Sequence, residues 1–65
     1  MKIHLATDHA GLELKNTIKT YLQKKYVIVD HGAHEYDALD DYPDFIIPCA
    51  LAVSKETSSR GIILG

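Results

Sequence analysis

Residues Lys2–Lys15 read K-I-H-L-A-T-D-H-A-G-L-E-L-K, the pattern of a strand that passes directly into a helix. The first five residues are apolar-rich, and we predict a strand over Lys2–Ala6. Thr7 and Asp8 are favoured helix-capping types, and Gly11 indicates a turn or a close approach of the backbone. The stretch therefore predicts a strand, a capped turn and the start of a helix.

A helix and a second strand are predicted to follow. We predict the helix over Leu12–Lys24, with an apolar stripe that faces the core. The stripe residues are Leu14, Ile18, Tyr21 and Leu22, and the residues placed away from it include Lys15, Asn16 and Lys19. Tyr26–Val29 is a nearly continuous β-branched and aromatic run, which is typical of a strand buried on both faces of a parallel sheet.

The second half of the chain repeats this alternation. We predict a loop over Asp30–Asp41 and a helix start at Asp41–Asp44, where Asp is a cap and Pro lies near the first helical position. This helix closes around Lys55–Ser59, and its apolar stripe consists of Ile46, Cys49, Ala50 and Val53. Pro48 predicts a late start or a bend, because proline has no N–H to donate. Arg60 leads into another buried-strand pattern, G-I-I-L-G, which ends at Gly65.

The predicted order β-α-β-α-β has connections long enough for parallel crossovers. It predicts the N-terminal half of a doubly wound, Rossmann-like α/β sheet with helices on both faces. We interpret residues 1–65 as the N-terminal portion of a single α/β domain, in a protein of roughly 140–160 residues. A chain of 65 residues buries only about 60% of its unfolded surface. Cys49 is the single cysteine, so an internal disulfide is excluded.

The composition narrows the function classes. The chain is 46% apolar and 25% charged, as in ordinary globular proteins. Its net charge of −2 argues against a nucleic-acid or anionic-membrane binder, which carries a basic stripe. No apolar run approaches the roughly 20 residues that span a bilayer, and the first strand leaves no room for a signal peptide. We therefore predict a soluble, cytoplasmic protein.

Candidate binding residues lie beyond the ends of the predicted strands, where open α/β sheets bind ligands. The Asp8 carboxylate can accept hydrogen bonds from sugar hydroxyls, and the His9 imidazole beside a helix N-terminus favours a phosphate. The alternative is that Asp8 only caps the helix and that His9 is a surface loop residue. Tyr42 either directs its hydroxyl into the same site or packs its ring against the edge of the sheet.

Other reactive residue types carry weaker signals. The H-x-x-H spacing of His31 and His34, near Asp30 and Glu35, matches no zinc pattern, so no metal is predicted. His4 is interpreted as a packed or edge histidine, and Cys49 as inert core. The sequence contains neither G-x-G-x-x-G after the first strand nor a P-loop, which argues against a dinucleotide or ATP site.

Several motifs together resemble a known family. They are D-H-A-G-L-E-L-K at Asp8–Lys15, D-H-G at Asp30–Gly32, D-Y-P-D at Asp41–Asp44 and R-G-I-I-L-G at Arg60–Gly65. In this order they resemble the N-terminal half of the type B ribose-5-phosphate isomerases, relatives of the galactose-6-phosphate isomerase subunits. The resemblance covers all 65 residues. It implies a doubly wound α/β fold, homodimers that often pair into tetramers, and no metal or organic cofactor. It also implies that ribose 5-phosphate and ribulose 5-phosphate interconvert through an enediolate, in the pentose phosphate pathway.

The resemblance also assigns roles to single residues. Asp8 corresponds to a sugar-hydroxyl contact, His9 to a neighbour of the ring oxygen or phosphate, and Tyr42 to a residue lining the pocket. In one branch of the family the base is a Cys directly after the third strand, where this chain has Gly65. The other branch is therefore implied, in which the base is the Glu of a downstream G-G-S-G-N-G-E turn. No catalytic residue is expected within these 65 residues, and the chain alone is expected to be inactive. The family's ring-opening His and phosphate-binding Arg residues are also expected after Gly65.

Two alternatives stay open. One is an isomerase of a hexose 6-phosphate such as galactose or allose 6-phosphate, whose longer sugar changes contacts outside these residues. The other is a non-catalytic flavodoxin-like or receiver-like binding module. Receiver domains need clustered acids after the first strand and an Asp after the third, where this chain has Asp8 alone and Gly65.

Overall fold

The computed structural model describes residues 1–35, 37, 39–41 and 43–64. The elements are β1 (Lys2–Thr7), a 3₁₀ turn η1 (His9–Gly11), α1 (Leu12–Leu22), β2 (Val27–Asp30), α2 (Pro43–Lys55) and β3 (Arg60–Leu64). The predicted β-α-β-α-β order is confirmed. Helix α1 ends two residues earlier than predicted, where the backbone N–H groups of Lys25 and Tyr26 both donate to the Leu22 carbonyl at 3.0 Å.

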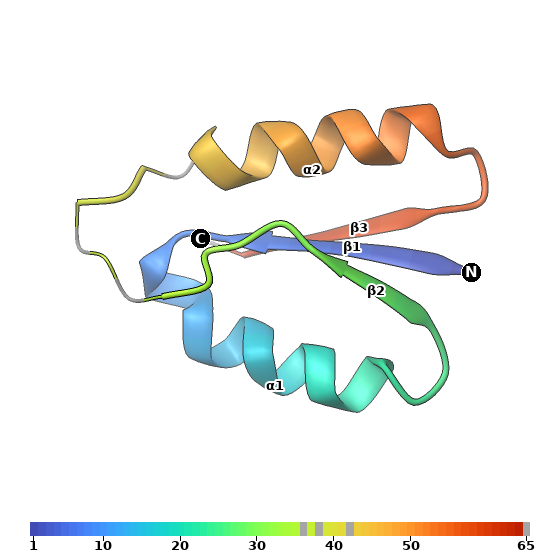
Figure 1. Cartoon of the computed structure of the whole chain (residues 1–65), viewed down its shortest axis with the longest axis horizontal. Coiled ribbons are helices and arrows are strands. Elements are labelled where there is room, and N and C mark those ends of the chain that lie inside the picture. Colours follow the sequence, from blue (N-terminus) through green and yellow to red (C-terminus); the bar gives the residue numbers. More distant parts are fainter. Residues whose placement is uncertain (36, 38, 42, 65) are drawn as a thin grey trace.

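Within the described residues, three strands form one parallel sheet in the order β2-β1-β3. Helices α1 and α2 lie on opposite faces of this sheet, as Figure 1 shows, which confirms the doubly wound α/β architecture. The central strand β1 is the most buried element: Leu5 is 1% exposed and Ala6 is 0% exposed. Because neighbouring side chains of a strand alternate between faces, Leu5 lies on the α1 side of the sheet and Ala6 packs against α2.

The predicted apolar stripe of α1 is wrong at two of its four positions. Leu14 is 55% exposed and Tyr21 is 76% exposed, whereas Lys15, which was placed away from the core, is 1% exposed. The inner face instead carries Leu12, Lys15, Ile18 and Leu22. A hydropathy pattern assigns every lysine to solvent, but a lysine can bury its aliphatic stem when a buried carboxylate meets its ammonium group.

Helix α2 follows its predicted stripe except at Ala50. Ile46 and Cys49 are buried and pack against Ala6, whereas Ala50 is exposed. The helix begins at Pro43, within the predicted start at Asp41–Asp44, and continues through Pro48, so of the two outcomes predicted for Pro48 the late start is wrong. The carbonyl that Pro48 leaves unpaired, four residues back, belongs to the first turn, where exposed backbone can bond to water.

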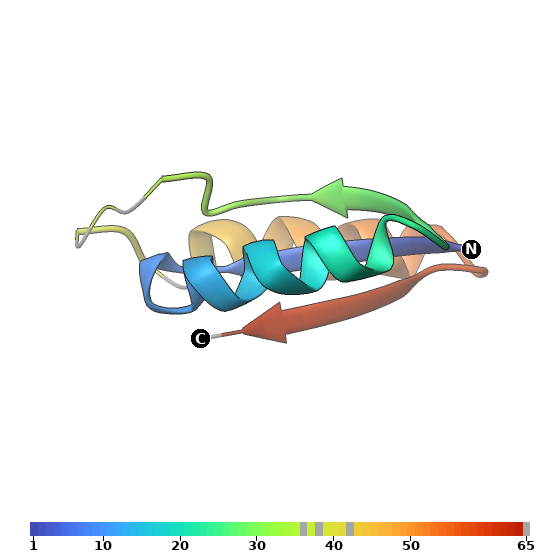
Figure 2. The same cartoon turned by 90° about the horizontal axis from the view of Figure 1, so that it is seen from below.

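The outer strands are more exposed than their apolar sequences predict. Strand β2 begins one residue later than predicted and includes Asp30, which the sequence assigned to the loop. Val27 in β2 is 63% exposed and Ile63 in β3 is 43% exposed. In the described part of the chain each of these strands pairs only with β1, and Figure 2 shows them on either side of it. Their side chains therefore lack the neighbours that would bury both faces.

Candidate functional site

Strand β1 delivers the predicted residues Asp8 and His9 to the carboxyl-terminal edge of the sheet, at the end where η1 and the β2–α2 loop lie (Figure 1). Asp8 has extended backbone angles, and its Oδ1 accepts a hydrogen bond from the Ala10 N–H at 3.0 Å. The carboxylate therefore caps η1, which is the structural contact foreseen as the alternative. This contact engages Oδ1, and a cap of this kind is compatible with a ligand at the other oxygen.

Gly11 allows η1 to lie close against the sheet. A methyl group at this position would clash with Thr7 Oγ1 and would lie 3.0 Å from Leu64 Cβ. The close backbone approach predicted for Gly11 is therefore confirmed. Thr7 is fully buried at the end of β1, and its Oγ1 has no hydrogen-bond partner among the described residues.

His9 pairs with a residue that the sequence analysis did not single out. Its Nδ1 lies 2.8 Å from Asp40 Oδ1, and its backbone N–H donates to the same oxygen at 3.2 Å. The hydrogen bond to Asp40 raises the pKa of His9; burial opposes this, and the charges of Asp40, Asp8 and Asp37 add to it. The two partners are 31 residues apart, and the acidic composition of the loop was the only sequence signal.

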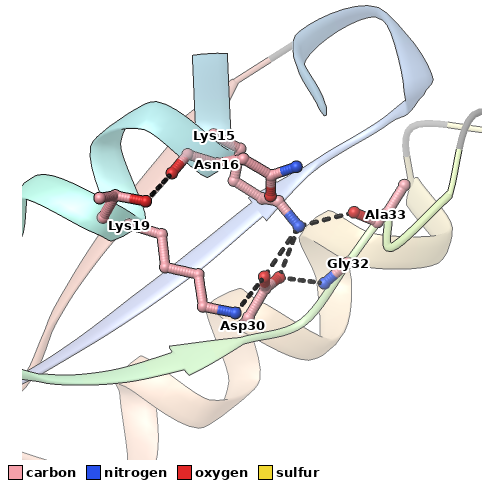
Figure 3. Close-up of polar contacts among 7 residues, drawn as sticks. Lys15, Asn16, Lys19, Asp30, Gly32 and Ala33 are labelled. Atoms are coloured by element: carbon pink, nitrogen blue, oxygen red, sulfur yellow. Dashed lines mark hydrogen bonds and ion pairs between the residues drawn. The ribbon is translucent and has the colours of Figure 1, made fainter. Parts of the chain in front are cut away.

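A buried ion pair fixes the start of the β2–α2 loop (Figure 3). The Lys15 ammonium group lies 2.8 and 2.9 Å from the two carboxylate oxygens of Asp30, and it donates to the Ala33 carbonyl at 2.6 Å. Asp30 also accepts from the Gly32 N–H at 2.9 Å and from Lys19 at 3.3 Å. Burial opposes ionisation of Asp30, but the hydrogen bonds from Lys15, Gly32 and Lys19 and the charge of Lys15 together outweigh it and lower the pKa.

The loop continues to pair with β1 beyond the end of β2. The His31 N–H donates to the Leu5 carbonyl at 2.9 Å, the Thr7 N–H to the Gly32 carbonyl at 2.8 Å, and the Ala33 N–H to the Thr7 carbonyl at 2.7 Å. The loop is therefore laid along the end of β1, directly beside Asp8. This path explains how Asp40, farther along the same loop, reaches His9.

His4 and His31 form a separate cluster with Glu56. His4 is 2% exposed, which confirms a packed histidine. Its Nε2 lies 2.9 Å from Glu56 Oε1 and its Nδ1 lies 2.9 Å from His31 Nε2. A carboxylate only accepts, so Nε2 of neutral His4 donates to Glu56, and His31 donates to Nδ1. His34 is exposed, and within the described part of the chain no group of His, Cys, Asp and Glu has the geometry of a metal site.

The other predicted positions divide into two groups. Tyr42 and Gly65 lie outside the described residues, so the predicted pocket role of Tyr42 remains a prediction. Cys49 lies on the sheet-facing side of α2 and is 1% exposed, and burial raises the pKa of its thiol, as expected of an inert core residue.

A hollow of about 220 Å³ lies beside Asp40. Its lining consists of Ala33, His34, Glu35, Asp37, Asp40 and Phe45.

The sequence model of the ribose/galactose isomerase family matches residues 3–65. The chain belongs to this family. It is 46% identical over 66 residues to ribose-5-phosphate isomerase B of Mycobacterium tuberculosis, and 44% identical over 66 residues to that of Mycolicibacterium paratuberculosis. Both alignments cover 100% of this chain but only 41% and 42% of the relatives. The chain thus spans about two fifths of the length of these family members.

Solved structures agree with this assignment. The fold superposes on ribose-5-phosphate isomerase B of Mycoplasma genitalium, solved with bound ribulose 5-phosphate, with a TM-score of 0.88 and 42% identity, over 95% of this chain and 42% of that one. The Clostridium thermocellum enzyme gives a TM-score of 0.89 and 41% identity, over 97% of this chain and 43% of that one. The family members therefore share the arrangement of strands and helices described above.

None of the helices formed by the described residues is long and apolar enough to span a membrane.

Proposed function

We propose that the protein carrying this chain is an aldose–ketose isomerase that interconverts ribose 5-phosphate and ribulose 5-phosphate. The observation that carries the proposal is the family match over residues 3–65, together with Asp8 and His9 at the carboxyl-terminal edge of the sheet. The reaction proposed is a proton transfer between C1 and C2 through an enediolate, as a step of the pentose phosphate pathway. Residues 1–65 form the N-terminal portion of its single domain, and the protein acts in the cytoplasm as a homodimer or a dimer of dimers.

The proposed roles follow from the chemistry of each side chain. Asp8 accepts hydrogen bonds from sugar hydroxyls with the carboxylate oxygen that does not cap η1. His9, whose pKa is raised, donates to the ring oxygen or phosphate of the substrate. Tyr42 lines the same pocket. The base that removes the proton is proposed to lie after Gly65, and no metal or organic cofactor takes part.

The test is isomerase activity of the complete polypeptide, measured as ribulose 5-phosphate formation. Asp8→Asn should lower turnover at least tenfold, on the order expected when one charged hydrogen bond is lost. Its melting temperature should stay nearly unchanged, because Asn caps as well as Asp. Glu13→Gln, on the exposed side of α1, is the matched control and should keep full activity. A wild-type protein without isomerase activity would refute the proposal, and equal losses of stability and activity in Asp8→Asn would leave Asp8 with its capping role alone.

A hexose 6-phosphate is the second candidate substrate, because the matched family includes galactose isomerases. The same assay with galactose 6-phosphate and allose 6-phosphate separates the two. A kcat/KM for either hexose phosphate above that for ribose 5-phosphate would reverse the order of the candidates. A protein that binds sugar phosphates without converting any of them would point to a non-catalytic module.

A further inference from the structure

We infer that Asp40 is a positioning residue for His9, and that it holds the imidazole with Nδ1–H facing the carboxylate so that the protonated ring presents Nε2–H to an acceptor oxygen of the substrate. The inference rests on the proposed function for the identity of that substrate. Asp40 itself is not proposed to touch the substrate. Its role is to fix the orientation and proton content of the group that does.

The geometry supports fixation of both the backbone and the ring of His9. Asp40 Oδ1 receives the Nδ1–H of the ring at 2.8 Å and the backbone N–H of the same residue at 3.2 Å. Two donors of one residue converge on one oxygen, so the ring is held relative to its own backbone. The ionised carboxylate cannot donate, hence Nδ1 must carry a proton. The two ring nitrogens point in different directions, so Nε2 is turned away from Asp40.

Burial makes this pairing strong. The Asp40 side chain is 8% exposed, and its second oxygen, Oδ2, is buried without a hydrogen-bond partner among the described residues. A buried carboxylate with an unsatisfied oxygen is costly, and the charged hydrogen bond from His9 offsets part of that cost. An uncharged loop residue would avoid this penalty. The acid is therefore explained by what it does to His9 better than by loop packing.

Among the described residues, three acidic side chains raise the pKa of His9. They are Asp8 on the preceding turn, and Asp37 and Asp40 on the β2–α2 loop. The hydrogen bond from Asp40 is the largest influence on the His9 pKa, and the charge of Asp37 is the smallest of those that raise it. The two loop acids therefore differ in kind: Asp40 bonds the ring, whereas Asp37 acts only through its charge. This difference provides a matched pair of variants.

The first experiment measures the His9 ring by ¹⁵N NMR in the complete polypeptide, across pH 5 to 9. Wild-type protein should show a protonated Nδ1 throughout. Asp40→Asn keeps an oxygen acceptor but removes the charge, so it should lower the His9 pKa by clearly more than Asp37→Asn does. Equal His9 pKa values in the two variants, or a wild-type ring that is unprotonated at Nδ1, would overturn the inference.

The second experiment measures isomerase kinetics of the same variants at pH 6.5, where the raised pKa keeps most of the wild-type His9 protonated. Asp40→Asn should raise KM about tenfold with kcat nearly unchanged, because it weakens a contact made equally in the ground and transition states. Asp37→Asn should leave KM within about twofold of wild type. A normal KM in Asp40→Asn despite a lowered His9 pKa would overturn the role toward substrate. If wild-type protein has no isomerase activity, the proposed function fails, and the NMR comparison still decides whether Asp40 fixes His9.

Discussion

At the scale of single residues, the site depends on polar groups that are buried and paired. Lys15 is 1% exposed and bridges Asp30 to the Ala33 carbonyl, so one ammonium group joins α1, β2 and the start of the loop (Figure 3). Lys19 reaches the same carboxylate from a half-exposed position, at 3.3 Å. The two lysines share a partner but differ in burial, and burial decides how much each contributes.

Lys15→Met should therefore destabilise the complete polypeptide far more than Lys19→Met. Removal of one partner of a buried ion pair costs up to about 3–5 kcal/mol. In Lys15→Met the Asp30 carboxylate would keep only the Gly32 N–H and the 3.3 Å contact with half-exposed Lys19. An exposed pair contributes about 0–1 kcal/mol. Urea unfolding of the two variants measures the difference. Similar midpoints for both would contradict the structural role of Lys15.

At the scale of elements, each face of the sheet carries a different kind of contact. The α1 face holds the Lys15–Asp30 pair, whereas the α2 face holds Ile46 and Cys49, with His4 buried near the end of the helix. His4 links His31 to Glu56 through two hydrogen bonds of 2.9 Å. Because two members of this row of hydrogen bonds are histidines, the stability of the α2 side of the sheet should depend on pH.

His31 should make the protein less stable below neutral pH. Burial, followed by the nearby His4, lowers the pKa of His31 from 6.5. The unfolded chain therefore binds more protons than the folded chain as the pH falls through 6.5, and this difference reduces the free energy of unfolding. His9 has a raised pKa and acts in the opposite direction, so the comparison must isolate His31.

The measurement is the free energy of unfolding at pH 7.5 and pH 5.5, for wild type and for His31→Gln. The variant should lose less stability between the two pH values than wild type does. The Glu56 pKa is also lowered, chiefly by its hydrogen bond from Lys2, but its contribution is lost only below its ordinary value of 4.5. An identical loss in both proteins would show that protonation of His31 does not cause the pH dependence of stability.

Cys49 packs in the core beneath the sheet-facing side of α2, and we predict that it takes no part in the chemistry. Its thiol is 1% exposed with a raised pKa, so little thiolate forms at neutral pH. Cys49→Ala should keep most of the isomerase turnover, and iodoacetamide should modify the native protein much more slowly than the urea-unfolded protein. Loss of kcat in Cys49→Ala with the fold intact would place the thiol in the reaction instead.

At the scale of the whole molecule, the sheet has one well-covered strand and two partly exposed ones. Val27 and Ile63 remain 63% and 43% exposed on the outer strands, and Ile47 and Leu51 are more than half exposed on α2. Solvated apolar strands with unpaired edges tend to pair with other chains. The relatives extend well beyond the matched region, and their additional residues are expected to cover such surfaces.

The isolated 65-residue chain should therefore melt over a broad range and associate as its concentration rises. Circular dichroism and sedimentation measure the two properties, with the complete polypeptide as the control. The control should show one cooperative transition, because longer chains bury a larger fraction of their surface. A sharp transition of the monomeric 65-residue chain would contradict this expectation.

The element order and the parallel sheet were predictable from the sequence, because strand and helix patterns depend on local spacing of apolar residues and on turn residues such as Gly11. The position of Asp8 and His9 at the carboxyl-terminal edge of the sheet was predictable for the same reason, since both residues follow the first strand directly. The sequence did not predict which face of α1 is buried, and it did not predict the pairing of Asp40 with His9. Burial of Lys15 and Asp40 depends on partners 15 and 31 residues away. A charged side chain enters a protein interior only where the folded chain brings it a partner, so the tertiary structure alone decided these contacts.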